Sequence, residues 1–286
     1  MVGSALCEVS MTLIDERFQG FQSLIGEQAF ARVRASSVCV VGLGGVGSWT
    51  VEALARSGVG SITLVDLDEV CITNVNRQLH ALTNTVGLAK VEVLAQRIAL
   101  INPACRVVAC KKFFSASTAH EILACRYDVV VDTIDSVDNK TELAVHCVER
   151  DQPMITVGSG GNRTNALAVQ VVDLANTIHD PLLQIVRKRL RQQHAFPRGE
   201  RARFGIPCVY APLQRGPRSS SANGCGVSER QTRKSCNEGL GSAVFVTGTI
   251  GFAAAGEVIR ELSQRAELPS APYPWKEKRA ARLAVS

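Results

Sequence analysis

The feature that most constrains the fold is a strand, a glycine-rich turn, a helix and a second strand within residues 37–68. Val38–Val41 is a short apolar run of mostly β-branched residues, typical of a buried parallel strand. Glycines follow it directly, and the helical pattern after them ends at Gly58. A second apolar run, 62–65, is closed by Asp66. The segment therefore predicts one βαβ unit of a Rossmann-like, doubly wound sheet.

This turn predicts a nucleotide site. The glycines are Gly42, Gly44, Gly45 and Gly47, and they let the backbone approach a phosphate while the following helix offers free N–H groups. Asp66 stands where a carboxylate accepts hydrogen bonds from ribose hydroxyls. The fingerprint alone also fits a nicotinamide or flavin enzyme, and a strand–helix turn that binds nothing is the plainer alternative. We expect a nucleotide, and its identity depends on the rest of the chain.

Composition sets wider limits. The chain has 286 residues, enough for one large or two modest domains, and a net charge of +6, which permits a polyanionic partner without requiring one. Its ten cysteines include no pair with CxxC spacing. We therefore expect reduced thiols in a cytosol-like compartment, with neither a disulfide framework nor a zinc site. The first twenty residues lack the hydrophobic region of a signal peptide.

The stretch 239–259 is long enough to span a bilayer and almost uncharged. Its glycines, among them Gly248, Gly251 and Gly256, and its hydroxyl side chains suit a helix packed closely against protein. We expect a buried helix and no membrane span.

Polar residues follow several predicted strands at the same sheet edge. Asn74, Arg77 and Gln78 come after the strand that ends near Asp66, and Lys90 lies in the first turn of a helix over about 87–100. A cation in a first turn opposes the helix dipole, which suggests that it meets an anion.

The remaining pattern continues the sheet. Apolar runs over 106–109, 127–132 and 153–158 predict further strands, and the second of them delivers Asp135 to the same carboxyl edge. Residues 138–149 read as a helix, and 166–172 as the start of an antiparallel excursion. Doubly wound α/β folds bind ligands at this edge.

Together, the turn at 42–48, the Asn-Val-Asn-Arg-Gln run at 74–78 and the separated polar residues resemble the E1-like adenylating superfamily. The residues that carry this resemblance are Asp66, Asp68, Lys90 and Asp135. It covers residue 17 to about residue 160. A nicotinamide dehydrogenase has no need for all of these elements together.

Four further stretches resemble the family of tRNA threonylcarbamoyladenosine dehydratases over nearly the whole chain. They are NRQLHALTNTVGLAKVEV, the IDS at 134–136, QVVDLANTIHDPL and SCNEGLGSAVFVTGTIGF. The resemblance implies ATP-dependent cyclisation of N6-threonylcarbamoyladenosine (t6A) at position 37 of tRNA, through adenylation of its carboxylate. It implies ATP and Mg²⁺ as cofactors, leaves a monovalent cation (K⁺ or Na⁺) open, and excludes zinc.

The same resemblance assigns the site. Arg77 and Lys90 neutralise phosphate charge in the transition state, Asp135 holds Mg²⁺, and Arg17 reaches the partner's ATP site across a homodimer. The residues implied to contact ATP are Gly42, Gly44, Gly45, Gly47, Asp66, Asp68, Asn74, Arg77, Gln78 and Lys90. Related enzymes carry a second arginine shortly after the first, where this chain has Gly20 and Ser23.

We expect an adenylation domain over 12–175, a substrate-shaping and dimerising part over 176–268 with a mobile basic loop at about 212–237, and a basic tail over 269–286. Residues 187–203 carry seven basic residues against one acidic, with Phe196 available for stacking on bases. The alternative is a solvated helix face and loop. The predicted tRNA contacts are Arg187, Lys188, Arg189, Arg191, Arg198, Arg201 and Arg203.

Partners and alternatives complete the hypothesis. We expect tRNA carrying t6A as substrate, a homodimer and a cytoplasmic location, or a mitochondrial one for a eukaryotic protein; a sulfur-transfer or electron-transfer partner is left open. The first alternative is an adenylyltransferase that activates the carboxyl terminus of a ubiquitin-like sulfur carrier. The second is a nicotinamide oxidoreductase, and the third a non-catalytic nucleotide-binding scaffold. Cys208, Cys225 and Cys236 are not needed for the cyclisation, and we expect packed thiols rather than nucleophiles.

Overall fold

A computed structural model describes residues 16–213, 241–264, 273, 275 and 276. Seven strands form one sheet within these residues. The sheet order is β3-β2-β1-β4-β5-β7-β6, parallel throughout except for the β6–β7 pair. The strands are β1 (Ser37–Val41), β2 (Ser61–Val65), β3 (Arg106–Cys110), β4 (Val129–Asp132), β5 (Met154–Val157), β6 (Gln170–Asp173) and β7 (Pro207–Tyr210). The predicted doubly wound sheet and its antiparallel excursion are confirmed.

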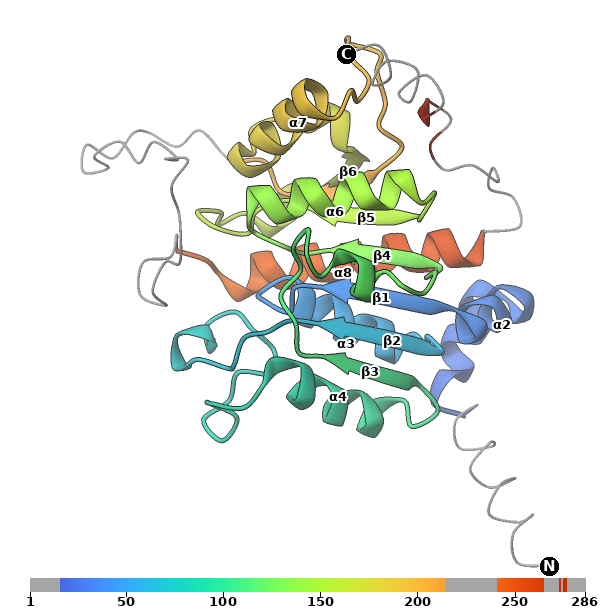
Figure 1. Cartoon of the computed structure of the whole chain (residues 1–286). Helices are drawn as coiled ribbons and strands as arrows, with labels where there is room; N and C mark the ends of the chain where they lie inside the picture. Colours follow the sequence, from blue (N-terminus) through green and yellow to red (C-terminus); the bar gives the residue numbers. More distant parts are fainter. Residues whose placement is uncertain (1–15, 214–240, 265–272, 274, 277–286) are drawn as a thin grey trace, which may run out of the picture.

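Helices cover both faces of this sheet (Figure 1). They are α2 (Glu27–Ala35), α3 (Gly47–Arg56), α4 (Lys90–Ile101), α5 (Ala119–Ile122), α6 (Val137–Glu149), α7 (Pro181–Gln193) and α8 (Val244–Ser263), and residues 16–25 are also helical. Three 3₁₀ turns are η1 (Ile72–Asn74), η2 (Ala166–Ala168) and η3 (Leu174–Asn176).

Two hydrophobic clusters explain why helices pack on both sides. Along β1, Val38 and Val40 join the cluster that includes α3, α4 and α8, whereas Cys39 and Val41 join the cluster with α5, α6 and α7. Successive strand side chains point to opposite faces, so an entirely apolar strand is stable only when both faces are covered. Burial of each such side chain stabilises the fold by roughly 1.5–3 kcal/mol.

The predicted buried helix is α8, which packs against α3 and the sheet. A Cβ atom on Gly251 would lie 2.7 Å from the carbonyl oxygen of Val46, so this position needs glycine for close approach. Thr50 Oγ1 donates to the Gly251 carbonyl at 3.2 Å and joins the two helices. Among the described helices, none is long and apolar enough to cross a membrane.

Part of the predicted basic tail contacts the core. Tyr273 is 2% exposed and donates to the Gln152 carbonyl at 2.8 Å. The indole N–H of Trp275 donates to the Phe204 carbonyl at 2.9 Å. The predicted loop at 212–237 lies outside the described residues, apart from its first two positions.

Candidate nucleotide site at the carboxyl edge of the sheet

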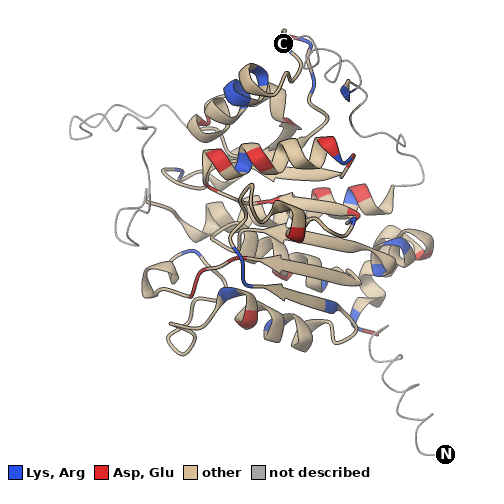
Figure 2. Cartoon of the chain, viewed as in Figure 1, with Lys and Arg blue, Asp and Glu red and all other residues tan. Residues whose placement is uncertain are grey.

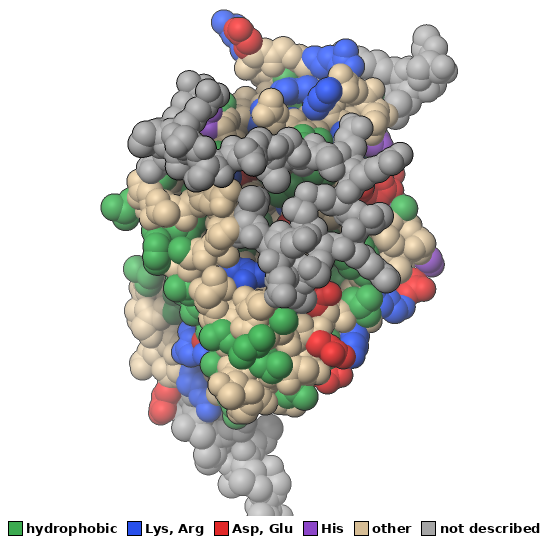
Figure 3. Space-filling view, turned by 90° about the vertical axis from the view of Figure 1, so that its left-hand side faces the viewer, with side chains coloured by type: hydrophobic (Ala, Val, Ile, Leu, Met, Phe, Trp, Pro, Cys, Tyr) green, Lys and Arg blue, Asp and Glu red, His purple; other side chains and the backbone are tan. Residues whose placement is uncertain are grey.

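The site lies where strand order reverses, because β1 has β2 on one side and β4 on the other. Connections from neighbouring strands leave this point toward opposite faces, which opens a crevice at the carboxyl edge. Figure 3 looks onto this edge, which is the left side of Figure 1.

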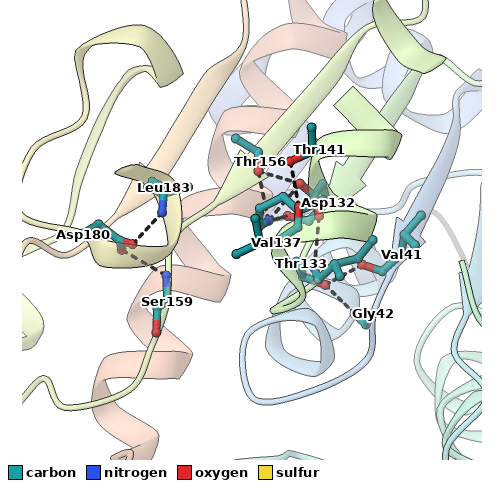
Figure 4. Close-up of polar contacts among 12 residues, drawn as sticks. Val41, Gly42, Asp132, Thr133, Val137, Thr141, Thr156, Ser159, Asp180 and Leu183 are labelled. Atoms are coloured by element: carbon teal, nitrogen blue, oxygen red, sulfur yellow. Dashed lines mark hydrogen bonds and ion pairs between the residues drawn. The ribbon is translucent and has the colours of Figure 1, made fainter. Parts of the chain in front are cut away.

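The glycine-rich turn after β1 is locked to the turn after β4. Gly42 has φ +92°, and a Cβ there would lie 3.0 Å from the Thr133 carbonyl oxygen, so only glycine fits without strain. Thr133 donates its backbone N–H to the Val41 carbonyl at 2.9 Å, and its hydroxyl bonds the carbonyls of Val41 and Gly42 (Figure 4). A Cβ on Gly47 would overlap the Gly42 carbonyl.

Asp66 braces the other side of the same turn. Its carboxylate accepts from the backbone N–H of Leu43 at 2.6 Å and of Asp68 at 2.8 Å. Burial raises the pKa of the Asp66 carboxyl above its ordinary value, while the nearby Lys90 cation and these two N–H groups oppose the rise. Asp66 therefore holds the glycine-rich loop in place.

Lys90 meets an anion of the chain itself. Its ammonium lies 2.9 Å from a carboxylate oxygen of Asp68, with the Lys90 side chain 6% exposed and that of Asp68 69% exposed. The carboxylate offsets the unfavourable placement of a cation at the start of α4. Asp66 connects this pair to the glycine turn, because its carboxylate accepts from the backbone N–H of both Asp68 and Leu43. A phosphate bound at the turn would compete with or join Asp68 for this cation.

Arg77 is held over the glycine turn by its neighbours. Its Nη1 donates to the Thr73 carbonyl at 2.9 Å and to Asn76 Oδ1 at 3.0 Å, while the Trp49 indole donates to the Arg77 carbonyl at 3.0 Å. A Cβ on Gly45 would lie 3.3 Å from Arg77 Cγ. The glycine turn and the arginine stem are thus in contact.

Three buried polar residues lie in the loop around Arg77. Asn74 Oδ1 accepts from the Cys71 backbone N–H at 3.1 Å and so caps η1. Gln78 Oε1 and both ring nitrogens of His80 have no hydrogen-bond partner among the described residues. Burial, with a smaller contribution from Lys90, lowers the pKa of His80 to about 4, so its ring is neutral near pH 7.

Asp135 differs from the other carboxylates of the site. It is exposed at the end of the β4 turn and forms no hydrogen bond or ion pair with any described residue. The described residues also hold no cluster of three or more His, Cys, Asp or Glu that would form a protein metal cage. A single free carboxylate beside a glycine-rich turn suits Mg²⁺, which binds through one or two carboxylates, phosphates and water.

Buried polar residues that the sequence did not predict lie under this turn. Asp132 and Lys140 form a buried ion pair at 2.8 Å, and Thr156 Oγ1 donates to the same carboxylate at 2.7 Å (Figure 4). The sequence signal was Asp132 itself, the last residue of an otherwise apolar strand.

Arg17 is not part of this site within one chain. Its Nη1 donates to the carbonyl of Ile101 at 3.3 Å, at the end of α4. Helices of such a sheet run opposite to the strands, so α4 ends at the amino edge, away from the glycine turn.

The basic stretch 187–203 is partly structural. Figure 2 shows α7 with basic positions in blue and the neighbouring α6 with acidic positions in red. Arg189 of α7 pairs with Asp138 of α6. Arg187 donates to Thr177, and the Arg191 guanidinium lies 5.2 Å from the Phe204 ring centroid. The exposed basic residues of the segment are Lys188, Arg198, Arg201 and Arg203.

The prediction that Phe196 is available to stack on bases is wrong. Phe196 is 0% exposed, with ring centroids 5.0 Å from Phe204 and 4.6 Å from Trp275. Cys208 is also fully buried in β7, and burial raises the pKa of its thiol well above the ordinary value. Such a thiol is a poor nucleophile. Cys225 and Cys236 lie outside the described residues.

The model of the ThiF family matches residues 18–279. The chain is 40% identical over 254 residues to the tRNA threonylcarbamoyladenosine dehydratase of Escherichia coli K12, covering 88% of this chain and 95% of that protein. It is 36% identical to the dehydratase of Bacillus subtilis 168 over 88% of this chain and 96% of that one.

A solved structure of the E. coli dehydratase, TcdA, in complex with ATP resembles this fold with a TM-score of 0.77 and 38% identity, covering 88% of this chain and 96% of that one. The E. coli sulfur carrier protein ThiS adenylyltransferase is 34% identical over 129 residues, which span 44% of this chain and 51% of that protein.

Proposed function

The chain belongs to the ThiF family, and we propose that it is an ATP-dependent dehydratase that converts t6A in tRNA into its cyclic form. The observation that carries this proposal is the convergence of the glycine turn, Arg77, Lys90 and the unpaired Asp135 at one edge of the sheet. The likeness to dehydratases over 88% of the chain supports the choice of substrate.

The reaction proceeds in two balanced steps. The t6A carboxylate attacks the α-phosphorus of ATP, forms an acyl–AMP anhydride and releases pyrophosphate. The urea group of the same nucleoside then attacks the activated carbonyl, loses a proton and expels AMP. The AMP carries away one carboxylate oxygen, so t6A loses one water overall. The nucleophile is already tethered to the electrophile, which replaces a bimolecular step by an intramolecular one.

The chain supplies binding and charge. The backbone N–H groups of Gly44, Gly45 and Gly47, in the turn that leads into α3, would bind the phosphates. Arg77 and Lys90 offset the negative charge that increases as pyrophosphate leaves. Asp66 orients the ribose. Asp135 would hold Mg²⁺, which would supply positive charge to the phosphates.

Two alternatives account for fewer observations. A sulfur-carrier adenylyltransferase uses the same adenylation chemistry, yet the likeness to the ThiS enzyme covers only 44% of this chain. A nicotinamide oxidoreductase is supported by the glycine fingerprint and Asp66 alone. It gives no role to Lys90 or to the exposed Asp135.

We also propose a homodimer, for which the exposed apolar residues support a contact surface. They are Val244, Phe245 and Phe252 on α8 and Ile72 and Val75 around η1, each at least 41% exposed. Arg17 would then act in the partner's site. Sedimentation velocity at micromolar protein tests this proposal, and a Phe252→Glu variant should sediment as a monomer.

The domain assignment at 12–175 and 176–268 remains our proposal, as does a cytoplasmic location. The four exposed cations of 187–203 are proposed tRNA contacts, whose charge reversal should weaken tRNA binding most at low salt. A requirement for K⁺ or Na⁺ is tested by replacing both with choline in the assay. No described residue is assigned to a sulfur-transfer or electron-transfer partner.

The test of the proposed function is nucleoside mass spectrometry of t6A-containing tRNA after incubation with the protein, ATP and Mg²⁺. We expect loss of one water from t6A, which requires ATP and is lost in Asp135→Ala. Asp138→Ala, an exposed carboxylate three residues further on, serves as control and should keep activity. Unchanged t6A, with pyrophosphate released only on addition of a Gly-Gly-ended carrier protein, would move the assignment to carrier activation.

A further inference from the structure

A buried lysine lies directly beneath the turn that carries Asp135. The Lys140 ammonium is 2.8 Å from Asp132 Oδ2, 3.4 Å from the Asp132 carbonyl and 3.1 Å from Thr156 Oγ1. These three acceptors match the three N–H donors of an ammonium group. The Lys140 side chain is 1% exposed and that of Asp132 0%. Neither group can touch a ligand at the sheet edge, so any influence on the reaction acts through other residues.

The Asp132 carboxylate links this cluster to the turn. Its Oδ2 accepts from the Thr156 hydroxyl at 2.7 Å (Figure 4) and from Lys140. Its Oδ1 accepts from the backbone N–H of Ile134 at 3.0 Å. Lys140 lies in the first turn of α6 and donates its own N–H to the Ser136 carbonyl at 3.0 Å. The strand end, the turn and the helix start are therefore closed into one hydrogen-bonded loop.

The same turn is fixed on its outer side by Thr133. The Thr133 hydroxyl reaches the Val41 and Gly42 carbonyls, so the loop that Lys140 closes is also the loop that shapes the glycine turn. Between these two anchors, Asp135 is left exposed and unpaired by any described residue. A buried ion pair is seldom a source of net stability, and apolar replacements often stabilise a fold as well. Its placement here calls for another explanation.

We infer that Lys140 and Asp132 are positioning residues for the metal-binding turn: the buried pair sets the backbone from Thr133 to Asp135 so that one end clamps the glycine turn while the Asp135 carboxylate points free toward ATP phosphates. This inference rests on the proposed function for the role of Asp135. It goes further by locating the determinant of Mg²⁺–ATP affinity in side chains that never touch either ligand.

The experiment measures ATP binding to the full chain by isothermal titration calorimetry, once with Mg²⁺ and once with EDTA. The measured quantity is the dissociation constant of ATP in EDTA divided by that in Mg²⁺. We call this ratio the Mg²⁺ gain, because it reports how much Mg²⁺ improves ATP binding. No tRNA is needed. A wild-type protein that binds ATP with a Mg²⁺ gain but leaves t6A unchanged would refute the dehydratase proposal and leave this inference testable.

The variants are Lys140→Met, Lys140→Arg and Thr156→Val. Arg163→Met is the matched control, because Arg163 forms an equally buried ion pair with Asp180, with side chains 3% and 0% exposed, at the end of the next strand. We expect Lys140→Met to reduce the Mg²⁺ gain about tenfold, a change of ~1.4 kcal/mol. Lys140→Arg, which keeps the charge, should restore part of it. Arg163→Met should lower the thermal unfolding midpoint but keep the wild-type gain.

An unchanged Mg²⁺ gain in folded Lys140→Met would overturn the inference, as would an equal loss of gain in Arg163→Met. Where Lys140→Met does not fold, Thr156→Val decides, since it keeps the ion pair and the side-chain shape and removes the hydroxyl from Asp132 and Lys140. It removes two hydrogen bonds to charged groups but leaves the ion pair, so it should reduce the gain by about twofold to threefold, less than Lys140→Met does. A wild-type gain in that variant contradicts the inference.

Discussion

Two buried ion pairs lie at the ends of neighbouring strands and shape two different turns. Lys140–Asp132 follows β4, and Arg163–Asp180 follows β5, with N–O distances of 2.8 and 2.7 Å. The first closes a loop of adjacent elements and leaves Asp135 exposed beside it. In the second, Asp180 accepts from the backbone N–H of Ser159 and of Leu183, so it joins the β5 turn to the start of α7 (Figure 4).

The difference lies in what each turn leaves unpaired. Around the second pair, Arg163 donates to the carbonyls of Gly161 and Ala211, and a Cβ on Gly158 would lie 2.6 Å from Asp180 Oδ2. These hydrogen bonds pair the polar groups of Arg163 and Asp180 within the turn, and they connect the turn to the residue that follows β7. The comparison indicates that the first turn is organised to present a charge, and the second to hold the carboxyl-terminal half together.

The largest expected effect is a loss of activity without a loss of stability, caused by a change in the turn after β4. Asp135→Asn should lower kcat/KM about 10²–10³-fold, because the carboxylate that would hold Mg²⁺ is lost and with it the ion's stabilisation of transition-state charge. Its free energy of unfolding should change by less than about 0.5 kcal/mol, since the side chain is exposed. Steady-state kinetics and urea unfolding measure the two quantities. Asp138→Asn is the control, and equal kinetic losses in both variants would refute a specific role for Asp135.

A change in the turn after β5 should instead lower stability. Arg163→Met leaves the Asp180 carboxylate buried without its cation, so the free energy of unfolding should fall by about 3–5 kcal/mol. Urea unfolding monitored by circular dichroism measures this change. Arg163→Lys should recover little of it, because an ammonium cannot reproduce the fork that meets three acceptors. A loss below about 1 kcal/mol, the range of exposed pairs, would contradict the view that this pair holds the carboxyl-terminal half.

Acid should lower the free energy of unfolding through His80, which lies in the loop around Arg77. Its pKa is about 4 in the folded chain, against 6.5 for a histidine in water, so the unfolded chain binds the proton first as pH falls. The stabilising contribution of neutral His80 is complete above about pH 6.5 and is lost progressively toward pH 4, by at most roughly 3 kcal/mol. His80→Asn should flatten unfolding free energy against pH in this window. The exposed His120→Asn is the control, and an unchanged slope in His80→Asn would contradict the assignment.

The smallest effect concerns the contact between the two loops. Thr133→Val removes the hydroxyl that bonds the Val41 and Gly42 carbonyls and should weaken ATP binding by about 1 kcal/mol, or roughly fivefold. Calorimetric titration with Mg²⁺ and ATP measures it. Thr141→Val removes a comparable bond to the Val137 carbonyl within α6 and should leave affinity unchanged. If Thr141→Val weakens binding as much, the loop contact has no special role.

Most of the fold was readable from the sequence, because apolar runs and glycines mark the parallel strands and the first turn. Asp66, Arg77 and Lys90 were also found at the correct edge, since polar residues that follow buried strands collect there. Lys140 was missed because it belongs to the polar run Asp-Asn-Lys at a helix start, a pattern typical of a surface. Only the inward-turned Asp132 carboxylate, a tertiary contact, explains its burial. Phe196 was misread for the same reason, because distant aromatic residues cover it.

The central claim is that the t6A carboxylate is adenylated, and the fate of its oxygen tests this most directly. The substrate is t6A-containing tRNA with ¹⁸O in both carboxylate oxygens, incubated with the protein, ATP and Mg²⁺. Mass spectrometry of the products should find one ¹⁸O in AMP, one in cyclic t6A and none in pyrophosphate. Recovery of the label in pyrophosphate, or cyclic t6A formed while AMP stays unlabelled, would contradict carboxylate adenylation.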